Sequence, residues 1–275
     1  MSLRFTKMHG IGNDFVIVDC RAQPFALDAV QIARIGDRHF GVGFDQLITI
    51  EPARDPICAF AYGIYNTDGS RAMQCGNGAR CVAAWLHRAG AIGVGATRLQ
   101  SPSGPVAVEL LDAGDVRVDM GVPRFAPTQV PLDLAAADPY RLRIDGTDIA
   151  FGAVSMGNPH ALLEVDDVDA APLATLGAAL SINAHFPHGC NVGFAQIVDR
   201  THLRLRVWER GAGATLACGS GACAAVAILR RRGKLDAGVD VRLPGGTLRI
   251  QWDGEGKPLW MHGPAQFVFE GELPL

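Results

Sequence analysis

Residues 74–89 read QCGNGARCVAAWLHRA and residues 217–232 read ACGSGACAAVAILRRR, so a Cys-Gly-x-Gly-Ala motif followed by an apolar run occurs twice. Each run carries apolar or small side chains on every side of a helix, and a glycine that can terminate the helix follows directly. A helix that is apolar all round must be buried on all sides. We therefore expect buried helices over 76–89 and 219–232, each surrounded by its own sheet.

Other similar residues recur at the same spacing along the chain, which is the signature of an internal repeat. The paired residues are separated by 142 to 145 positions: Cys75 and Cys218, Gly12 and Gly157, Gln46 and Asn191, Gly104 and Gly246, and Gly121 and Gly263. The pattern predicts a duplicated domain, with one half over 1–118 and the other over 119–262. The segment from Gly121 opens the second half, whereas its counterpart ends the chain. Residues 263–275 are therefore expected to fold back onto the first half.

Short strands are expected to dominate the rest of each half, because 33 glycines and 16 prolines imply many tight turns. Alternating or β-branched stretches occur at 14–20, 46–51, 105–111, 160–165 and 202–208. Weaker amphipathic helices are expected at about 28–39 and 169–180, outside the sheets. The predicted fold class is α+β, with two pseudo-symmetric duplicated domains. Each is a curved, mostly antiparallel sheet around a central buried helix, and the active site lies in the cleft between them.

The composition is typical of a folded globular protein of 275 residues, with 48% hydrophobic and 19% charged residues. Lys plus Arg number 25 against 28 Asp plus Glu, so the net charge of −3 supplies no basic field for nucleic acid or an anionic membrane. Residues 1–15 lack the apolar core of a signal peptide, and no charge-free run approaches the ~18 residues that span a bilayer. We expect a cytoplasmic protein with a small-molecule substrate.

The two repeated cysteines, Cys75 and Cys218, are expected at the first turn of each buried helix. Free backbone N–H groups and the helix dipole stabilise an anion there and should lower the pKa of a thiol. The glycines that follow let backbone amides approach a carboxylate closely. Two such positions facing one ligand would place a thiol on each face of it, which suits inversion of a stereocentre. The other five cysteines are interpreted as small core residues: Cys20, Cys58, Cys81, Cys190 and Cys223.

Cofactor chemistry has little support in the sequence. Pyridoxal phosphate needs a Schiff-base lysine, and the chain has only Lys7, Lys234 and Lys257, none in a phosphate-binding context. The GAGATL stretch at 211–216 lacks the third glycine of a dinucleotide fingerprint and the Lys-Ser/Thr of a P-loop. The histidines form no HxxxH pair. We therefore expect no cofactor and no metal.

Four ordered motifs carry a resemblance over essentially the whole chain. They are FTKMHGIGNDFV at 5–16, YNTDGSRAMQCGNGARC at 65–81, SMGNPHA at 155–161, and WERGAGATLACGSGAC at 208–223. With them the chain resembles the diaminopimelate epimerases, cofactor-independent isomerases that interconvert LL- and meso-diaminopimelate on the bacterial route to lysine and peptidoglycan. The resemblance implies two similar α+β domains, each a curved sheet round a helix.

The same resemblance implies roles for individual residues. Cys75 and Cys218 would be the two acid/base thiols, whose roles swap with the direction of reaction. The residues implied to hold the reacting carboxylate are Gly76, Asn77, Gly219 and Ser220. Those implied to fix the ammonium groups and the distal carboxylate are Asn13, Gln46, Asn66, Asn158, Asn191, Glu209 and Arg210. His160 and Glu209 would tune the thiols, and a homodimer is implied, with Phe269 where some relatives place a tyrosine at the dimer contact.

Two alternatives remain open from the sequence. A racemase of the same fold acting on proline or hydroxyproline typically carries a His after the first Cys-Gly, whereas Asn77 stands there in this chain. Arg210 and the site asparagines also favour a longer substrate with a second charged end. A thiol redox sensor without turnover would explain the paired cysteines but not this polar set.

Overall fold

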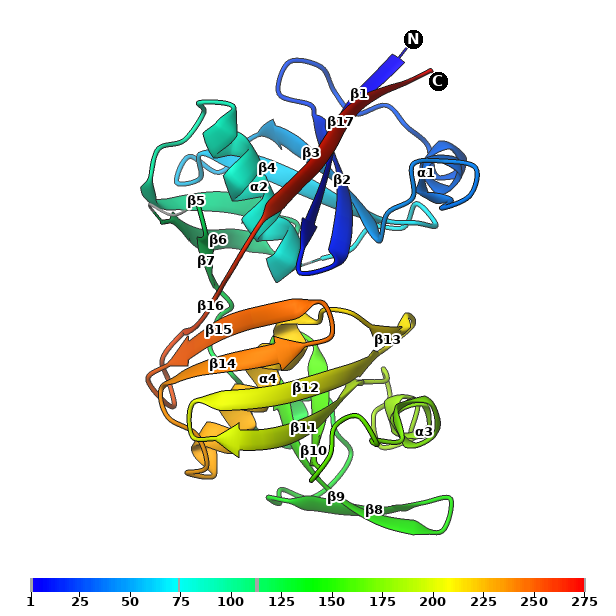
Figure 1. Ribbon diagram of the computed structural model, residues 1–275, viewed down its shortest axis with the longest axis vertical. Helices are drawn as coiled ribbons and strands as arrows, with labels where there is room; N and C mark the ends of the chain where they lie inside the picture. The colour runs from blue at the N-terminus through cyan, green and yellow to red at the C-terminus, as the bar shows by residue number, and fades with distance from the viewer. Residues whose placement is uncertain (1, 74, 112–113, 275) are drawn as a thin grey trace. The chain divides into compact units, whose positions relative to one another are not determined.

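The computed structural model describes residues 2–73, 75–111 and 114–274. Gln74, the first residue of the repeated motif, lies outside the described residues. The chain divides into two compact units, coloured along the sequence in Figure 1. Unit 1 comprises Met1–Asp119 and His262–Leu275, and unit 2 comprises Met120–Met261. Each boundary lies one residue from the position expected from the repeat.

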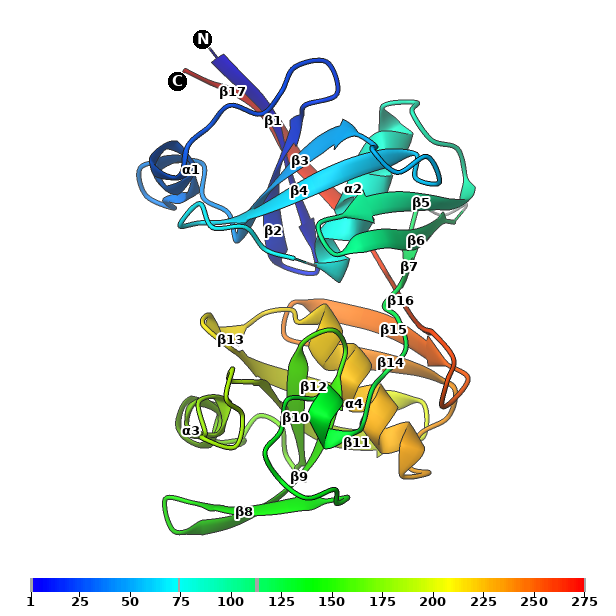
Figure 2. The same cartoon turned by 180° about the vertical axis from the view of Figure 1, so that it is seen from behind.

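Unit 1 is a single sheet curled around one helix. Its elements are β1 (Ser2–Gly10), β2 (Asn13–Asp19), α1 (Ala29–Gly36), β3 (Gln46–Pro52), β4 (Phe60–Asn66), α2 (Gly76–Arg88), β5 (Gly95–Ser101), β6 (Gly104–Leu110), β7 (Val116–Asp119) and β17 (Gln266–Pro274). The strands pair in the order β17, β1, β2, β3, β4, β5, β6, β7, antiparallel except at β2/β3 and β4/β5. Since α2 contacts β1 and β2 as well as β6 and β7, the sheet wraps around this helix (Figure 2).

The C-terminal strand β17 belongs to unit 1 because it pairs with β1. The pairing is antiparallel and runs from Ser2 opposite Pro274 to His9 opposite Gln266. Phe5 of β1 and Phe269 of β17 contact edge to face, with ring centroids 5.9 Å apart. The tail thus folds onto the first half of the chain.

Unit 2 repeats the same architecture. Its elements are η1 (Pro127–Gln129), β8 (Tyr140–Ile144), β9 (Thr147–Ser155), β10 (Pro159–Glu164), η2 (Leu173–Gly177), α3 (Ala178–Ser181), β11 (Asn191–Asp199), β12 (His202–Glu209), β13 (Gly213–Thr215), α4 (Gly219–Arg231), β14 (Gly238–Leu243), β15 (Gly246–Trp252) and β16 (Leu259–Gly263), which ends in unit 1. From β9 through β10, β11, β12 and β14 to β15, parallel and antiparallel pairings alternate as they do from β1 to β6. Helix α4 contacts strands β9, β10, β11, β12 and β15.

The strand register confirms the internal repeat residue by residue. In unit 1 Phe15 of β2 lies opposite Gln46 of β3, and in unit 2 His160 of β10 lies opposite Asn191 of β11. Both members of the second pair follow the first by 145 positions. The fold is therefore a duplicated α+β domain, and the sheets are mixed, because parallel pairs connect the antiparallel ones.

The two central helices begin and end where the sequence predicts. Cys75 and Cys218 are the N-cap residues, and both have extended backbone. Gly90 and Gly233 follow the C-caps with left-handed φ values of 68° and 72°, which glycine adopts without steric cost. Arg80 of α2 is a charged side chain in this apolar helix. It is completely buried, and its Nε donates to the Pro264 carbonyl at 3.4 Å.

The two outer helices differ in how well they match their expected ranges. Helix α1 starts one residue after Asp28, whose side chain forms a capping box with Gln31. The prediction of a helix over 169–180 is wrong for residues 169–172, because helical structure starts only at Leu173. Pro172 stands directly before it, and a proline disfavours helical backbone at the preceding residue.

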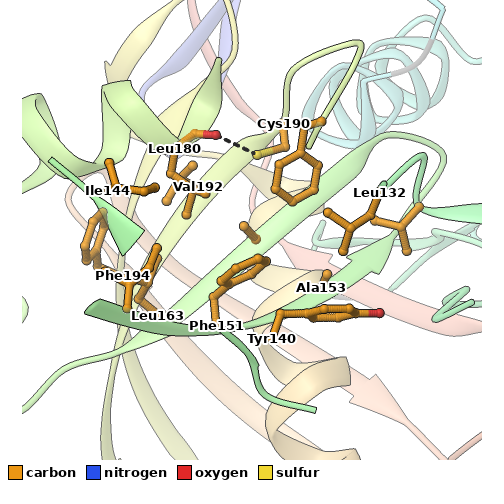
Figure 3. Close-up of a cluster of buried hydrophobic side chains, with 14 of the residues drawn as sticks. Leu132, Tyr140, Ile144, Phe151, Ala153, Leu163, Leu180, Cys190, Val192 and Phe194 are labelled. Atoms are coloured by element: carbon orange, nitrogen blue, oxygen red, sulfur yellow. Dashed lines mark hydrogen bonds between the residues drawn. The ribbon is translucent and has the colours of Figure 1, made fainter. Parts of the chain in front are cut away.

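A cluster of buried apolar side chains forms a core in unit 2 (Figure 3). Phe151 of β9 is fully buried there, stacked on Tyr140 with ring centroids 5.5 Å apart and 6.1 Å from Phe186. Cys190 is also completely buried, and its thiol donates to the Leu180 carbonyl at 3.7 Å. Cys190 is therefore a small core residue, as expected. Among the described residues, no helix is long and apolar enough to cross a membrane.

Candidate functional site

In unit 1, the start of β2 meets the N-terminus of α2. Asn13 is the first residue of β2, and its Oδ1 accepts from Asn77 Nδ2 at 3.1 Å and from the Cys75 thiol at 3.7 Å. The Cys75 sulfur in turn accepts from the Gly78 backbone N–H at 3.4 Å. A Cβ at Gly78 would lie 2.8 Å from Ile48 Cδ1, so a larger residue there would require the Ile48 side chain to shift. Three residues expected at the site, Asn13, Cys75 and Asn77, are thus in direct contact.

Gln46 and Asn66 form a second polar pair in the same unit. They lie opposite each other on β3 and β4, and Gln46 Nε2 donates to Asn66 Oδ1 at 3.1 Å. Two carboxamide oxygens are buried without a hydrogen-bond partner among the described residues of unit 1, Gln46 Oε1 and Asn77 Oδ1. A buried acceptor without a partner has a desolvation cost, so such atoms are suited to a ligand that donates hydrogen bonds.

In unit 2, the start of β10 meets the N-terminus of α4. Asn158 Nδ2 donates to Ser220 Oγ at 3.5 Å, and Ser220 Oγ lies 3.8 Å from the Cys218 sulfur. His160 Nε2 lies 3.0 Å from Asn158 Oδ1. Burial, and then the charge of Arg210, lowers the pKa of His160 to about 3, so the imidazole is neutral at physiological pH. Since Asn158 Oδ1 can only accept, Nε2 of the neutral ring carries the proton.

Glu209 and Arg210 lie at the end of β12, beside Asn191. The Arg210 backbone N–H donates to Asn191 Oδ1 at 2.9 Å, and its Nη1 donates to the His188 carbonyl. Glu209 Oε1 accepts from the Thr215 hydroxyl at 2.5 Å. Unit 2 therefore gathers its own predicted residues around the first turn of α4, where Gly219 is the first helical residue, as Gly76 is in α2.

One expectation about the thiols is wrong in unit 2. Burial first, and then the negative charge of Glu209, raises the pKa of Cys218 well above its usual value. The helix N-terminus does not compensate, because Cys218 is only 3% exposed and a carboxylate lies beside it. The free protein therefore holds Cys218 as a protonated thiol at neutral pH.

The sequence analysis missed the charged residues around Asn13. Asp45 Oδ2 accepts from Asn13 Nδ2 at 2.8 Å, and Arg38 Nη2 donates to Asp45 Oδ1 at 2.7 Å. Asp14 lies in the same cluster, with Lys7 Nζ 2.5 Å from its Oδ2. The available signal was adjacency, because Asp14 follows Asn13 and Asp45 precedes Gln46 in the motifs already singled out. Within the described residues, no group of three or more His, Cys, Asp or Glu side chains is arranged to hold a metal ion.

Comparison with known proteins identifies the family of the chain. The sequence profile of the family described as diaminopimelate epimerase matches residues 5–126 and 152–268. A diaminopimelate epimerase of Xanthomonas axonopodis pv. citri (strain 306) is 57% identical over 272 residues, covering 98% of this chain and 96% of the relative. The diaminopimelate epimerase of Xanthomonas campestris pv. campestris (strain ATCC 33913) has the same identity and the same coverage.

A solved structure shares the fold at much lower identity. The chain superposes on a probable proline racemase from Agrobacterium radiobacter K84 with a TM-score of 0.73, at 19% identity, over 99% of this chain and 93% of the other. This likeness shows a common fold alone. The family profile, by contrast, covers the ranges that contain both repeated cysteine motifs, and the two relatives match nearly the full length of the chain. The chain therefore belongs to the diaminopimelate epimerase family.

Proposed function

We propose that this chain is an isomerase that interconverts LL- and meso-diaminopimelate, using Cys75 and Cys218 as its acid and base. The observation that carries the proposal is the matched placement of two thiols. Each unit has a cysteine at the N-cap of its buried central helix, and each has an asparagine from the neighbouring strand end beside that helix. A duplication would not by itself retain a polar first turn on an otherwise apolar helix.

The proposed reaction moves one proton off the α-carbon and one onto it. A thiolate takes the α-proton, the electron pair of the C–H bond moves into the carboxylate as an enediolate, and the second thiol donates a proton to the opposite face. Backbone donors at Gly76, Asn77, Gly219 and Ser220 would hold the carboxylate where its negative charge increases. The raised pKa of Cys218 supports its role as the proton donor in one direction, and microscopic reversibility exchanges the roles in the other.

Other groups match the remaining charges of diaminopimelate. The buried acceptors Gln46 Oε1 and Asn77 Oδ1 are suited to an ammonium group, which only donates hydrogen bonds. The Arg210 guanidinium is suited to the distal carboxylate, because it pairs with carboxylates through two parallel N–H donors. Asn66, Asn158, Asn191 and Glu209 complete the proposed substrate contacts. No step of this mechanism calls for a cofactor or a metal.

Proton NMR in deuterated water tests the proposal directly. Incubating the protein with LL-diaminopimelate and no added cofactor should convert the substrate to the meso form while the α-proton signal disappears. The reason is that the thiol which delivers the new proton has exchanged with solvent. Loss of the signal for L-proline or hydroxyproline instead would support the alternative racemase. If no α-proton exchanges in any of these substrates, the result would contradict the epimerase hypothesis and leave the redox-sensor hypothesis.

We propose in addition that the protein is a homodimer that associates through β17. The support is two exposed apolar residues of β17, Val268 and Phe269, which are 54% and 48% exposed on a strand that pairs with β1. Light scattering should give a mass near twice 29.1 kDa. Phe269→Asp should reduce it toward the single-chain value, and a wild-type mass of one chain would contradict the dimer.

A further inference from the structure

The Asn13 carboxamide connects a carboxylate to the Cys75 thiol. Its nitrogen donates to Asp45 Oδ2 at 2.8 Å, and its oxygen accepts from Asn77 Nδ2 at 3.1 Å and faces the Cys75 sulfur at 3.7 Å. A carboxylate has only acceptor atoms, so the nitrogen of Asn13 must point at Asp45. The oxygen must then point at the thiol. Asp45 thus holds the nitrogen end of the amide away from Cys75, and the Asn77 donor holds the oxygen end beside it.

Asp45 is itself held in place by charged neighbours. Arg38 Nη2 donates to its Oδ1 at 2.7 Å and the Asp14 backbone N–H to its Oδ2 at 3.1 Å. Arg38 also donates to both oxygens of Asp14, at 2.8 and 3.1 Å, and Lys7 is bonded to the same carboxylate. Burial alone would raise the pKa of Asp14, but the hydrogen bonds from Arg38 and Lys7 outweigh burial and lower it to about 2. Asp14 therefore stays ionised at neutral pH.

Unit 2 lacks these charges, and its equivalent amide is turned the other way. The repeat matches Asn13 with Asn158, Asp14 with Pro159 and Asp45 with Cys190. Unit 2 therefore has no carboxylate at the positions equivalent to Asp14 and Asp45. Asn158 has the opposite orientation. Its oxygen faces His160 at 3.0 Å, and its nitrogen faces Ser220 at the first turn of α4.

We propose that Asp45 is a positioning residue for the catalytic Cys75, which keeps the Asn13 oxygen turned to the thiol so that Cys75 acts there as a hydrogen-bond donor. The catalytic role of Cys75 rests on the proposed function, but the orientation of the amide does not. Without Asp45 the amide can rotate and present its N–H₂ group to the sulfur. An N–H donor stabilises the thiolate, as the Gly78 N–H already does, so the pKa of Cys75 should fall.

Other titratable groups near the sulfur do not obscure this change. Cys75 interacts electrostatically with Tyr62 of β4 and Cys81 of α2. Burial raises the pKa of Tyr62 and raises that of Cys81 to about 12, so neither changes charge below pH 10. Among the described residues, the charged groups bonded to Asn13 or to its partner Asp45 include Arg38, which also binds Asp14, and Lys7 binds Asp14 in turn.

The test is the pH dependence of Cys75 alkylation in the full-length chain without substrate. Protein is treated with iodoacetamide between pH 6 and 10, and the Cys75 peptide is quantified by mass spectrometry. Asp45→Ala should move the midpoint of the profile down by about one pH unit. A shift of this size corresponds to the free energy of one hydrogen bond to the sulfur. Asp45→Glu, which retains an acceptor-only side chain, should restore a midpoint close to that of the wild type.

Two comparisons separate positioning from simple loss of charge. Asp37→Asn removes the same charge from the same segment, at a carboxylate that accepts from the His39 and Phe40 N–H groups, and should leave the midpoint unchanged. In an Asn13→Ala background, Asp45→Ala should cause no further shift, because the amide through which Asp45 acts is absent. An equal shift in that background, or an unchanged midpoint in folded Asp45→Ala and Asp45→Asn proteins, would overturn the proposal. Alkylation needs no turnover, so the result stands apart from the outcome of the epimerase assay.

Discussion

Replacing either Cys75 or Cys218 by alanine is expected to abolish epimerisation of diaminopimelate. Inversion needs a proton removed from one face of the α-carbon and another delivered to the opposite face, so neither thiol can replace the other. Loss of one acid/base group alone costs roughly 10² to 10⁴ in rate, and inversion cannot be completed without both. The measurement is kcat for LL to meso conversion, and near-normal turnover by either variant would contradict the two-thiol mechanism.

Matched controls exist in the same two helices. Cys81 and Cys223 are completely buried one turn or more beyond the N-caps, so Cys81→Ala and Cys223→Ala should remain active. The small loss of buried volume should lower stability only slightly.

Proton exchange should further distinguish the two alanine variants. A variant that keeps the thiol facing the α-proton of the LL form can still exchange that proton for deuterium, with retention of configuration. The variant that lacks this thiol can neither exchange the α-proton of the LL form nor invert its configuration. Exchange without inversion in one variant would therefore show which cysteine acts on which face.

Replacing Arg210 by alanine is expected to raise KM for diaminopimelate by about 10- to 100-fold. The reason is the loss of the charge-assisted contact to the distal carboxylate, which contributes roughly 1.5–3 kcal/mol. The neighbouring Asn191 should keep its position, because it is bonded to the backbone N–H of residue 210 and not to the guanidinium. His160 should remain neutral, since burial is the larger cause of its lowered pKa.

Two variants make the Arg210 result specific. Arg210→Lys keeps the charge without the two parallel donors and should give an intermediate KM. Arg206→Ala removes an arginine from β12, the strand that leads to Arg210, one whose Nη1 donates to the Asp169 carbonyl, and should leave KM unchanged. An unchanged KM in Arg210→Ala would remove this residue from the substrate site.

Much of the fold could be predicted from the sequence because it depends on local patterns repeated twice. The apolar runs after Cys75 and Cys218 identify the two central helices, since no other arrangement buries a helix that is apolar on every side. The glycines that follow mark their ends. The strand over 14–20 corresponds to β2 (Asn13–Asp19) and that over 202–208 to β12, each within one residue. The registers that place Phe15 against Gln46 and His160 against Asn191 differ by the same offset of 145 that is seen in the sequence.

The burial of individual side chains and the charges around them could be learned only from the tertiary structure. Arg80 looks like a surface residue in the sequence, yet it is buried in α2 against the returning tail at Pro264. The raised pKa of Cys218 depends on how deeply the sulfur is buried and on Glu209, nine residues earlier, lying beside it.

The sequence by itself determined the duplicated fold, its two helix N-termini and the residues that stand there, because hydrophobic periodicity and glycine placement act over a few neighbouring positions. Only the tertiary structure decided how those residues interact. The Asn13 and Asn158 amides occupy equivalent positions yet turn opposite ends to their helices, since one lies against the Asp45 carboxylate and the other against the neutral His160 ring. Such contacts join residues 32 positions apart or on different strands, and hydrogen-bond direction depends on which donor or acceptor the folded chain brings within reach.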